Sequence, residues 1–274
     1  MASAKDVYAS VRERLQTAGV SEPDAKARVI VAEALEIQFS DIFLQADVNV
    51  LAIKRIDEMA ERCAAGEPVQ YVTGRAYFRY AVLAVSPDVL IPRQETELVA
   101  EKAIQLIREN GYKTALDLCT GSGCIAISVQ TESGIQMHAC DISEKALMIA
   151  KQNAAANNAD VLFFSSDMLS RVTGTYDIIV SNPPYVSEGE YETLDADVKY
   201  FEPRIALVAG DGLDCYRIIA DEAKQYLSQG GALVLEIGAE QGMDVMGLLQ
   251  ANGYHSVTCE KDYAGRDRIV TARR

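Results

Sequence analysis

Five short apolar runs after residue 93 limit the folds that are open to the chain. Stretches in which apolar residues recur with helical spacing separate most of these runs. Strands that alternate with helices in this way form a mainly parallel sheet with helices on both faces. The sequence therefore predicts an α/β domain, and the end of the chain (254–274) predicts an antiparallel pair of strands at one edge. The five runs span residues 114–118, 136–140, 161–164, 177–181 and 232–237.

The first 92 residues have a different pattern. Apolar residues recur with helical spacing over residues 1–65, without a strand pattern between them, which predicts a small helical domain. Residues 66–92 alternate Tyr, Val and Phe with polar residues around a turn at Gly74, which predicts a β-hairpin that links two domains. Residues 93–274 then form the α/β domain. We expect the helical domain to select the substrate.

Composition and charge narrow the classes of function. The net charge is −14, and Lys and Arg form no cluster outside the last few residues, which argues against a nucleic-acid partner. The six cysteines form no C-x-x-C pair and only two histidines are present, so we expect no metal site. No apolar run approaches the roughly 18 residues of a membrane helix, and the start of the chain has no signal-peptide pattern. We therefore expect a cytoplasmic protein without a membrane partner.

A glycine-rich turn follows the first predicted strand of the α/β domain. Gly121 and Gly123 in "LDLCTGSGCIAIS" (116–128) permit a tight turn and a close approach of a ligand to the backbone. Asp141 ends the next predicted strand, 20 residues after Gly121, where a carboxylate can accept hydrogen bonds from both hydroxyls of a ribose. These features predict a nucleoside site. Because "GSGCIA" also fits the dinucleotide fingerprint G-x-G-x-x-A, a nicotinamide-dependent oxidoreductase is an alternative.

Two further acids fall near the same predicted edge of the sheet. Asp117 stands on the strand before the turn and favours a cationic amine or a sulfonium over a pyrophosphate as its neighbour. Asp167, after the third strand, can accept a hydrogen bond from an exocyclic amino group, and Met168 can pack on a flat base. The alternative for "SSDML" (165–169) is an ordinary loop or helix cap.

The stretch "DIIVSNPPY" (177–185) places a stiff polar loop at the end of the fourth predicted strand. Its two prolines have fixed φ angles and lack backbone donors. The Asn182 side-chain oxygen and the Pro183 carbonyl remain as acceptors for a planar NH2 group, and Tyr185 offers it a flat face. Such acceptors turn the lone pair of the nitrogen toward an electrophile and stabilise the positive charge that grows on it. The pattern predicts methyl transfer from a sulfonium held in line with that nitrogen.

With these motifs the chain resembles one family nearly end to end, the bacterial peptide chain release factor glutamine methyltransferases. The resemblance implies a class I, Rossmann-like methyltransferase fold with a seven-stranded sheet, and S-adenosylmethionine as the cofactor. It implies methylation of the side-chain amide (N5) of the glutamine in the Gly-Gly-Gln motif of release factors, which act in translation termination. The segments that carry it are "GEPVQYVTG" (66–74), "VLIPRQETE" (89–97), "LDLCTGSGCIAIS", "SNPPYV", "EPRIALVAGDGLDCYR" (202–217) and "LEIGAEQG" (235–242).

The resemblance also implies roles for individual residues. It assigns the cofactor to the glycine-rich loop, Asp141 and Asn182, with Met168 against the adenine. To these we add Asp117 and Asp167 as cofactor contacts. The tetrad Asn182, Pro183, Pro184 and Tyr185 is expected to hold the glutamine, with Asn182, Pro183 and Tyr185 as its catalytic residues. The residues of the glycine-rich loop are Cys119, Thr120, Gly121, Ser122 and Gly123.

Two positions depart from the family pattern, and the segment after the tetrad is acidic. Cys119 stands where the family commonly has Gly, and Met168 where an aromatic residue is common; we expect both to reshape cofactor binding without changing the chemistry. Residues 181–203 carry six acids against one base, Lys199. This charge suits a basic protein loop and repels a phosphate backbone. We expect a release factor as partner, no direct nucleic-acid contact, and a monomer, with amino methylation of a nucleic-acid base as the alternative.

Overall fold

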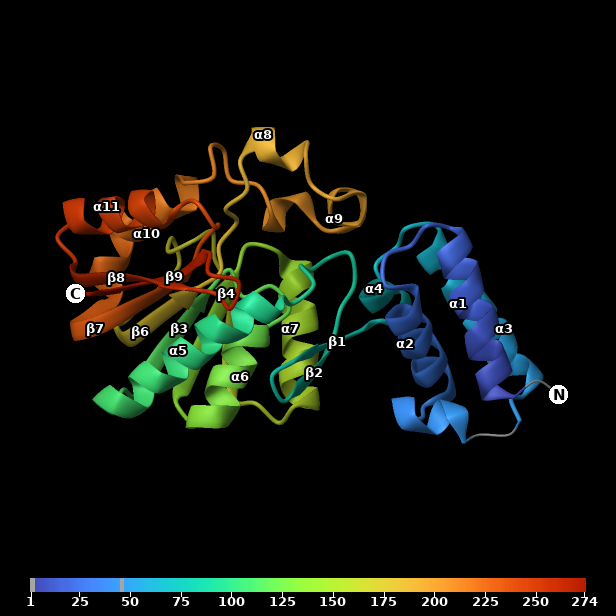
Figure 1. Ribbon diagram of the computed structural model, residues 1–274. Helices are drawn as coiled ribbons and strands as arrows, with labels where there is room; N and C mark the ends of the chain where they lie inside the picture. Colours follow the sequence, from blue (N-terminus) through green and yellow to red (C-terminus); the bar gives the residue numbers. More distant parts are fainter. Residues whose placement is uncertain (1–2, 45–46) are drawn as a thin grey trace. The chain divides into compact units, whose positions relative to one another are not determined.

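The computed structural model describes residues 3–44 and 47–274 (Figure 1). Residues 1–2 and 45–46 of the predicted helical domain therefore lie outside the described residues. The chain forms two compact units. The first falls within residues 1–75 together with Asp195–Phe201, and the second comprises Ala76–Leu194 and Glu202–Arg274. The boundaries predicted at residues 65 and 92 differ from this division, because the first unit continues to Arg75 and takes in a segment from the middle of the chain.

The first unit is helical, as the apolar spacing of its sequence predicts. Two of its helices begin at side-chain caps, where Ser3 accepts a hydrogen bond from the Asp6 backbone and Asn49 accepts one from Ala52. The helices between residues 4 and 73 pack around a core of buried, mainly aliphatic side chains. The helices of the first unit are α1 (Ala4–Thr17), α2 (Pro23–Leu35), the 3-10 helix η1 (Phe39–Phe43), α3 (Val50–Ala64), α4 (Val69–Thr73) and α9 (Ala196–Phe201).

The predicted hairpin region, 66–92, is only partly a hairpin. It begins with helix α4, and the two strands are limited to β1 (Arg75–Phe78) and β2 (Ala81–Ala84). Strand β2 is tied to the rest of the second unit by Asn153, whose side chain accepts from the Ala84 N–H at 2.7 Å and donates to the Ala84 carbonyl at 3.0 Å. Residues 85–93, which follow β2, have no regular structure and supply part of the site described below.

The second unit contains a seven-stranded sheet in the order β5-β4-β3-β6-β7-β9-β8. Strand β9 pairs antiparallel with both β7 and β8, and the other pairs are parallel. The predicted fold class is therefore confirmed. The strands are β3 (Thr114–Leu118), β4 (Gln136–Asp141), β5 (Val161–Ser165), β6 (Tyr176–Ser181), β7 (Leu227–Glu236), β8 (His255–Lys261) and β9 (Asp267–Arg273).

Alternate residues of the central strands face two separate cores. Ala115 and Val234 pack in the core on the side of α5 and α6, whereas their neighbours Leu116 and Leu235 pack in the core on the side of α10 and α11. Figure 1 shows these helices on opposite faces of the sheet. Both cores leave the carboxyl ends of β3, β4, β6 and β7 at one edge. The remaining helices are α5 (Gln94–Asn110), α6 (Cys124–Ser133), α7 (Glu144–Ala156), α8 (Glu188–Tyr191), the 3-10 helix η2 (Arg204–Ala206), α10 (Asp214–Tyr226) and α11 (Gly242–Ala251).

Candidate active site

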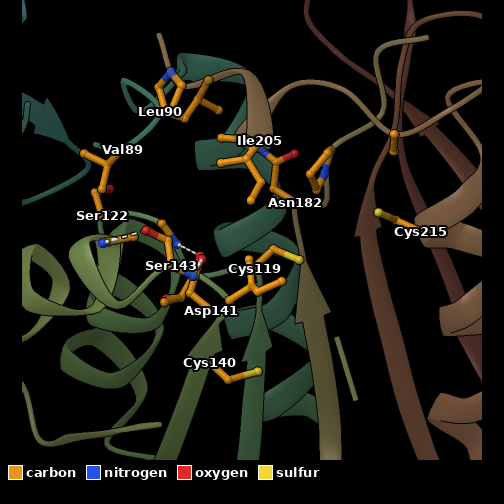
Figure 2. Close-up of a pocket in the computed structure, with 18 of the residues that line it drawn as sticks. Val89, Leu90, Cys119, Ser122, Cys140, Asp141, Ser143, Asn182, Ile205 and Cys215 are labelled. Carbon is orange, nitrogen blue, oxygen red and sulfur yellow. Dashed lines mark hydrogen bonds between the residues drawn. The ribbon is translucent and has the colours of Figure 1, made fainter. Parts of the chain in front are cut away.

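A cavity of about 340 Å³ lies in the second unit at the carboxyl ends of the parallel strands. This volume is in the range of small-molecule sites, and the position is where open α/β sheets bind ligands. Figure 2 shows Cys119, Asp141 and Ser143 at one side of the cavity, with Asn182 and Ile205 above them in this view. The sequence-predicted residues that line it are Cys119, Thr120, Gly121, Ser122, Asp141, Asp167, Met168, Asn182 and Pro184.

The glycine-rich loop is held by the main chain and by Asp141. The Gly121 N–H donates to Asp141 Oδ2 at 2.8 Å, and the Ser143 N–H donates to Asp141 Oδ1 at 2.9 Å. Gly123 has φ 83°, and a Cβ atom there would lie 3.2 Å from the Ala150 Cβ. Glycine is therefore required at 123 for close packing of α6 on α7, and Gly123 is not among the residues that line the cavity.

Asp117 lies beneath the loop and is fully buried. Its Oδ2 accepts a hydrogen bond of 2.6 Å from the Thr120 hydroxyl, whereas Oδ1 has no partner among the described residues. Burial raises the pKa of Asp117 to about 7. Asp117 was expected beside the ligand, but it does not line the cavity. Asp117 is linked to the cavity by its hydrogen bond with Thr120, which lines it.

The side chains of Cys119 and Cys140 both contact Met168 beside the glycine-rich loop. Cys119 Sγ is 3.7 Å from Met168 Sδ, and Cys140 Sγ is 3.8 Å from the Met168 carbonyl. Cys119 and Met168 are the two departures from the family pattern, so these departures are neighbours in space. Burial raises the pKa of the Cys119 thiol well above its usual value, which keeps it protonated.

The tetrad divides between the cavity and the protein interior. Asn182 and Pro184 line the cavity, whereas Pro183 and Tyr185 are not among the lining residues. The half-buried Tyr185 ring packs against the core on the α10 and α11 face, and burial raises the pKa of Tyr185 to about 12. Its carbonyl accepts a 2.9 Å hydrogen bond from Gln241 Nε2, which fixes the loop at the start of α11.

Two polar residues next to the tetrad were not predicted as site residues. Asn182 Nδ2 donates to the Thr96 hydroxyl at 3.2 Å, and Thr96 lines the cavity from the first turn of α5. Glu236, which ends β7, is 1% exposed, and the hydroxyl groups of Thr96 and Tyr185 lower the pKa of its carboxyl group by hydrogen bonding. Burial raises the pKa of Glu236 to about 7. The only sequence signal was a charged residue at the end of the apolar run "ALVLEI".

An ion pair joins two of the segments that line the cavity. Glu202 accepts a 3.1 Å hydrogen bond from the Ile91 N–H and pairs with the Arg93 guanidinium. It thereby joins the segment before α5 to the segment around η2, and Leu90 and Ile205 from these two segments line the cavity. Glu202 was counted in the sequence among acids that attract a basic partner. Glu202 is buried and already paired, so it holds these two segments together and does not face a partner.

No group of three or more His, Cys, Asp or Glu side chains able to hold a metal ion occurs within residues 3–44 and 47–274. In the same part of the chain, no helix is long and apolar enough to cross a membrane.

Two protein-family models match the sequence of the chain. A model described as "Methyltransferase small domain" matches residues 96–200, and one described as "PrmC N-terminal domain" matches residues 6–74. The release factor glutamine methyltransferase of Agrobacterium fabrum is 37% identical over 278 residues, which cover 97% of this chain and 95% of the relative. The enzyme of that name from Bacteroides thetaiotaomicron is 38% identical over 278 residues, covering 98% and 99%.

Comparison with solved structures agrees on the fold. A methyltransferase from Pyrococcus furiosus matches with a TM-score of 0.53 and 19% identity, covering 70% of this chain and 88% of that one. The hMettl16 catalytic domain, solved in complex with the MAT2A 3'UTR hairpin 6, matches with a TM-score of 0.58 and 15% identity, covering 80% of this chain and 81% of that one. At these identities the likeness concerns the methyltransferase fold alone.

Proposed function

The chain belongs to the family of release factor glutamine methyltransferases, and we propose that its cavity uses S-adenosylmethionine to methylate the glutamine of a release factor Gly-Gly-Gln motif. The observation that carries this proposal is the position of Asn182. Its side chain lines the same cavity as Asp141 and the glycine-rich loop. An acceptor for an amide NH2 group and an acceptor for ribose hydroxyls therefore share one small-molecule site. Neither base methylation nor nicotinamide chemistry is favoured by the family.

The residues present fit S-adenosylmethionine. Each oxygen of Asp141 accepts one backbone N–H, and each keeps a further lone pair for one ribose hydroxyl. Asp167 and Met168 border the cavity where we propose the adenine, and the loop backbone from Cys119 to Gly121 borders the methionyl part. When bound, the cofactor supplies a methyl group on a sulfonium, which is an electrophile with a good leaving group.

We propose that the tetrad orients the glutamine amide. Asn182 Oδ1 makes no hydrogen bond within the described part of the chain, so it is available to accept one N–H of the substrate. We assign the Pro183 carbonyl to the other N–H and the Tyr185 ring to the flat face of the amide, so the substrate must reach beyond the residues that line the cavity, which include neither of them. Two accepted hydrogen bonds turn the nitrogen lone pair toward the methyl group and stabilise the charge that develops. The proton leaves the nitrogen after transfer, so no general base is required.

We propose a basic loop of a release factor as the partner. Residues 188–194, after the tetrad, carry Glu188, Glu190 and Glu192, of which Glu188 is paired with Arg204. Acidic residues next to a site raise the encounter rate with a basic partner and disfavour a phosphate backbone. The helical unit is proposed to select the whole factor. This predicts a lower kcat/KM for a short Gly-Gly-Gln peptide than for the intact release factor.

The test is transfer of labelled methyl from S-adenosylmethionine to a purified release factor. A matched substrate with its Gly-Gly-Gln glutamine changed to alanine serves as the control. We expect label on the unchanged factor only. Label on neither protein, with binding of the cofactor confirmed by a thermal shift, would overturn the proposed substrate. Label on both would place the methyl group on another residue.

A further inference from the structure

Three polar side chains are connected in series at the ends of β6 and β7, the side of the cavity where we propose that the methyl group is transferred. Ser181 of β6 pairs with Leu235 of β7, so the residues that follow them, Asn182 and Glu236, emerge side by side at the edge of the sheet. Thr96 lies between the two. Its hydroxyl accepts from Asn182 Nδ2 at 3.2 Å. The same hydroxyl lies close enough to the Glu236 carboxyl group to lower its pKa by hydrogen bonding.

The hydrogen-bonding capacities of these groups give the series a direction. An ionised carboxylate only accepts hydrogen bonds, and a hydroxyl has one hydrogen to donate. When the Thr96 hydroxyl donates to Glu236, it can only accept from Asn182. The amide nitrogen of Asn182 must then face Thr96, and its oxygen must face away from Thr96.

The opposite orientation of the Asn182 amide has a different consequence. It would present an NH2 group to the NH2 group of the substrate, and two donors cannot form a hydrogen bond. Resting on the proposed function, we propose that Thr96 and Glu236 are positioning residues, which hold the Asn182 side chain with its oxygen toward the glutamine amide. Neither residue needs to touch the reacting atoms for this role.

The burial of the two residues fits this role better than one in stability. Thr96 is 2% exposed and Glu236 is 1% exposed, and Glu236 Oε2 has no hydrogen-bond partner within the described residues. An unpaired buried carboxylate oxygen reduces the free energy of unfolding. A neutral or apolar side chain at the end of β7 would pack at lower cost, so the carboxylate is explained by what it does to Thr96.

The charges around Glu236 come from several elements. Arg268 of β9 favours its ionised form, and Glu95 of α5 opposes it. The phenols of Tyr185 and Tyr216 and the thiol of Cys124 also face it. Burial outweighs Arg268 and raises the pKa of Glu236 to about 7. Assays at pH 8 therefore examine the ionised, acceptor-only form.

The test compares Thr96→Val with Thr96→Ser at pH 8, using the full chain, S-adenosylmethionine and a release factor. Valine keeps the shape of threonine but cannot accept from Asn182, so we expect kcat to fall about 10-fold or more. We expect the KM for S-adenosylmethionine to stay within about 2-fold, because the cofactor side is unchanged. Thr96→Ser keeps the hydroxyl and should retain most of the wild-type kcat.

Two further variants complete the design. Ser128→Ala removes another buried hydroxyl, on α6 outside the cavity, and should leave kcat unchanged. Glu236→Gln can donate to Thr96 and so permits the reversed amide, which predicts a loss of kcat of about 10-fold. This variant decides the question if Thr96→Val does not fold.

The outcomes separate the two proposals. A wild-type protein that labels no release factor would remove the proposed function before any variant is compared. A wild-type protein that transfers methyl, with Thr96→Val and Glu236→Gln equally fast, would overturn the positioning role alone. Equal losses in Thr96→Val and Thr96→Ser would also overturn it, because the hydroxyl would then not be the active feature.

Discussion

The two sides of the cavity are built from different chemical groups, main-chain groups on one side and side chains on the other. On the cofactor side, at the ends of β3 and β4, the main chain makes the contacts: both oxygens of Asp141 accept backbone N–H groups. On the transfer side, at the ends of β6 and β7, side chains contact side chains, and Glu236 Oε2 has no partner among the described residues. The loop of the first side is held in shape without a ligand, whereas the second side presents polar groups that the protein does not satisfy.

This difference teaches where substitutions are tolerated. A site made by main-chain groups depends on backbone shape, so its side chains are free to change if the turn survives. Cys119 and Met168, the two departures from the family pattern, are examples of such side chains. Both have positive φ angles, and their sulfur atoms lie 3.7 Å apart. A site made by side chains depends on single atoms, so we expect the largest effects on rate at the transfer side.

The largest effect is predicted for Asn182→Ala, which removes the substrate acceptor from the transfer side. We expect kcat to fall by about 100-fold, in line with the loss of one preorganised polar group. The KM for S-adenosylmethionine should change little, because the loop and Asp141 are untouched. Steady-state kinetics with both substrates measure this. Asn157→Ala, which removes an amide that contacts the β2 backbone, is the matched control and should keep kcat. Near-full turnover of Asn182→Ala would refute the role of the tetrad.

The contrast also explains which features could be predicted from the sequence. Strand β3 was predicted with its observed ends, 114–118, because apolar periodicity and turn residues are local signals. The loop and Asp141 were brought to one cavity because consecutive parallel strands end at the same edge. The cofactor side is therefore largely readable from local patterns.

The transfer side depends on contacts between distant residues. Thr96 and Asn182 are 86 positions apart, and Ile91 and Glu202 are 111 positions apart. No periodicity indicates such pairs. The burial of two acids could not be predicted from local patterns either. Asp117 lies beneath the glycine-rich loop and Glu202 is buried in its ion pair with Arg93, although they were expected to face a ligand and a partner, respectively.

The second prediction concerns Asp117, a buried acid beneath the cofactor side with one unpartnered oxygen among the described residues. Because burial raises its pKa to about 7 in the folded chain, ionisation is harder there than in the unfolded chain, where the pKa is near 4. The folded state therefore loses stability as the pH rises from about 4 to about 7. We expect this group to lower the free energy of unfolding by about 2 kcal/mol between pH 5 and pH 8.

Asp117→Asn should lack this loss, because an amide does not ionise and still accepts from Thr120. Urea unfolding of both proteins at the two pH values measures the difference. Glu236 titrates in the same range in both, so it cancels in the comparison. Parallel changes in the two proteins would show that Asp117 is not the source of this loss on the cofactor side.

The third prediction is for Asp141→Asn. The amide that replaces the carboxylate would face its NH2 group toward the N–H of Gly121 or Ser143, so one main-chain contact is lost along with the negative charge. We expect the KM for S-adenosylmethionine to rise about 10-fold with a smaller change in kcat, the reverse of the pattern for Asn182→Ala. An unchanged KM would remove Asp141 from the ribose. A loss confined to kcat would erase the distinction between the two sides.

The smallest effect is predicted for Tyr185→Phe, which tests whether the ring or the hydroxyl matters on the transfer side. Phenylalanine keeps the flat face and the packing against the core, and it removes a hydroxyl group that lowers the pKa of Glu236. We expect kcat to fall by about 2- to 3-fold, because Thr96 still donates to the carboxylate. Tyr185→Ala removes the ring as well and should cost far more. Equal losses in the two variants would assign the role to the hydroxyl. The transfer side would then depend on the charge of Glu236 as much as on the shape of the tetrad.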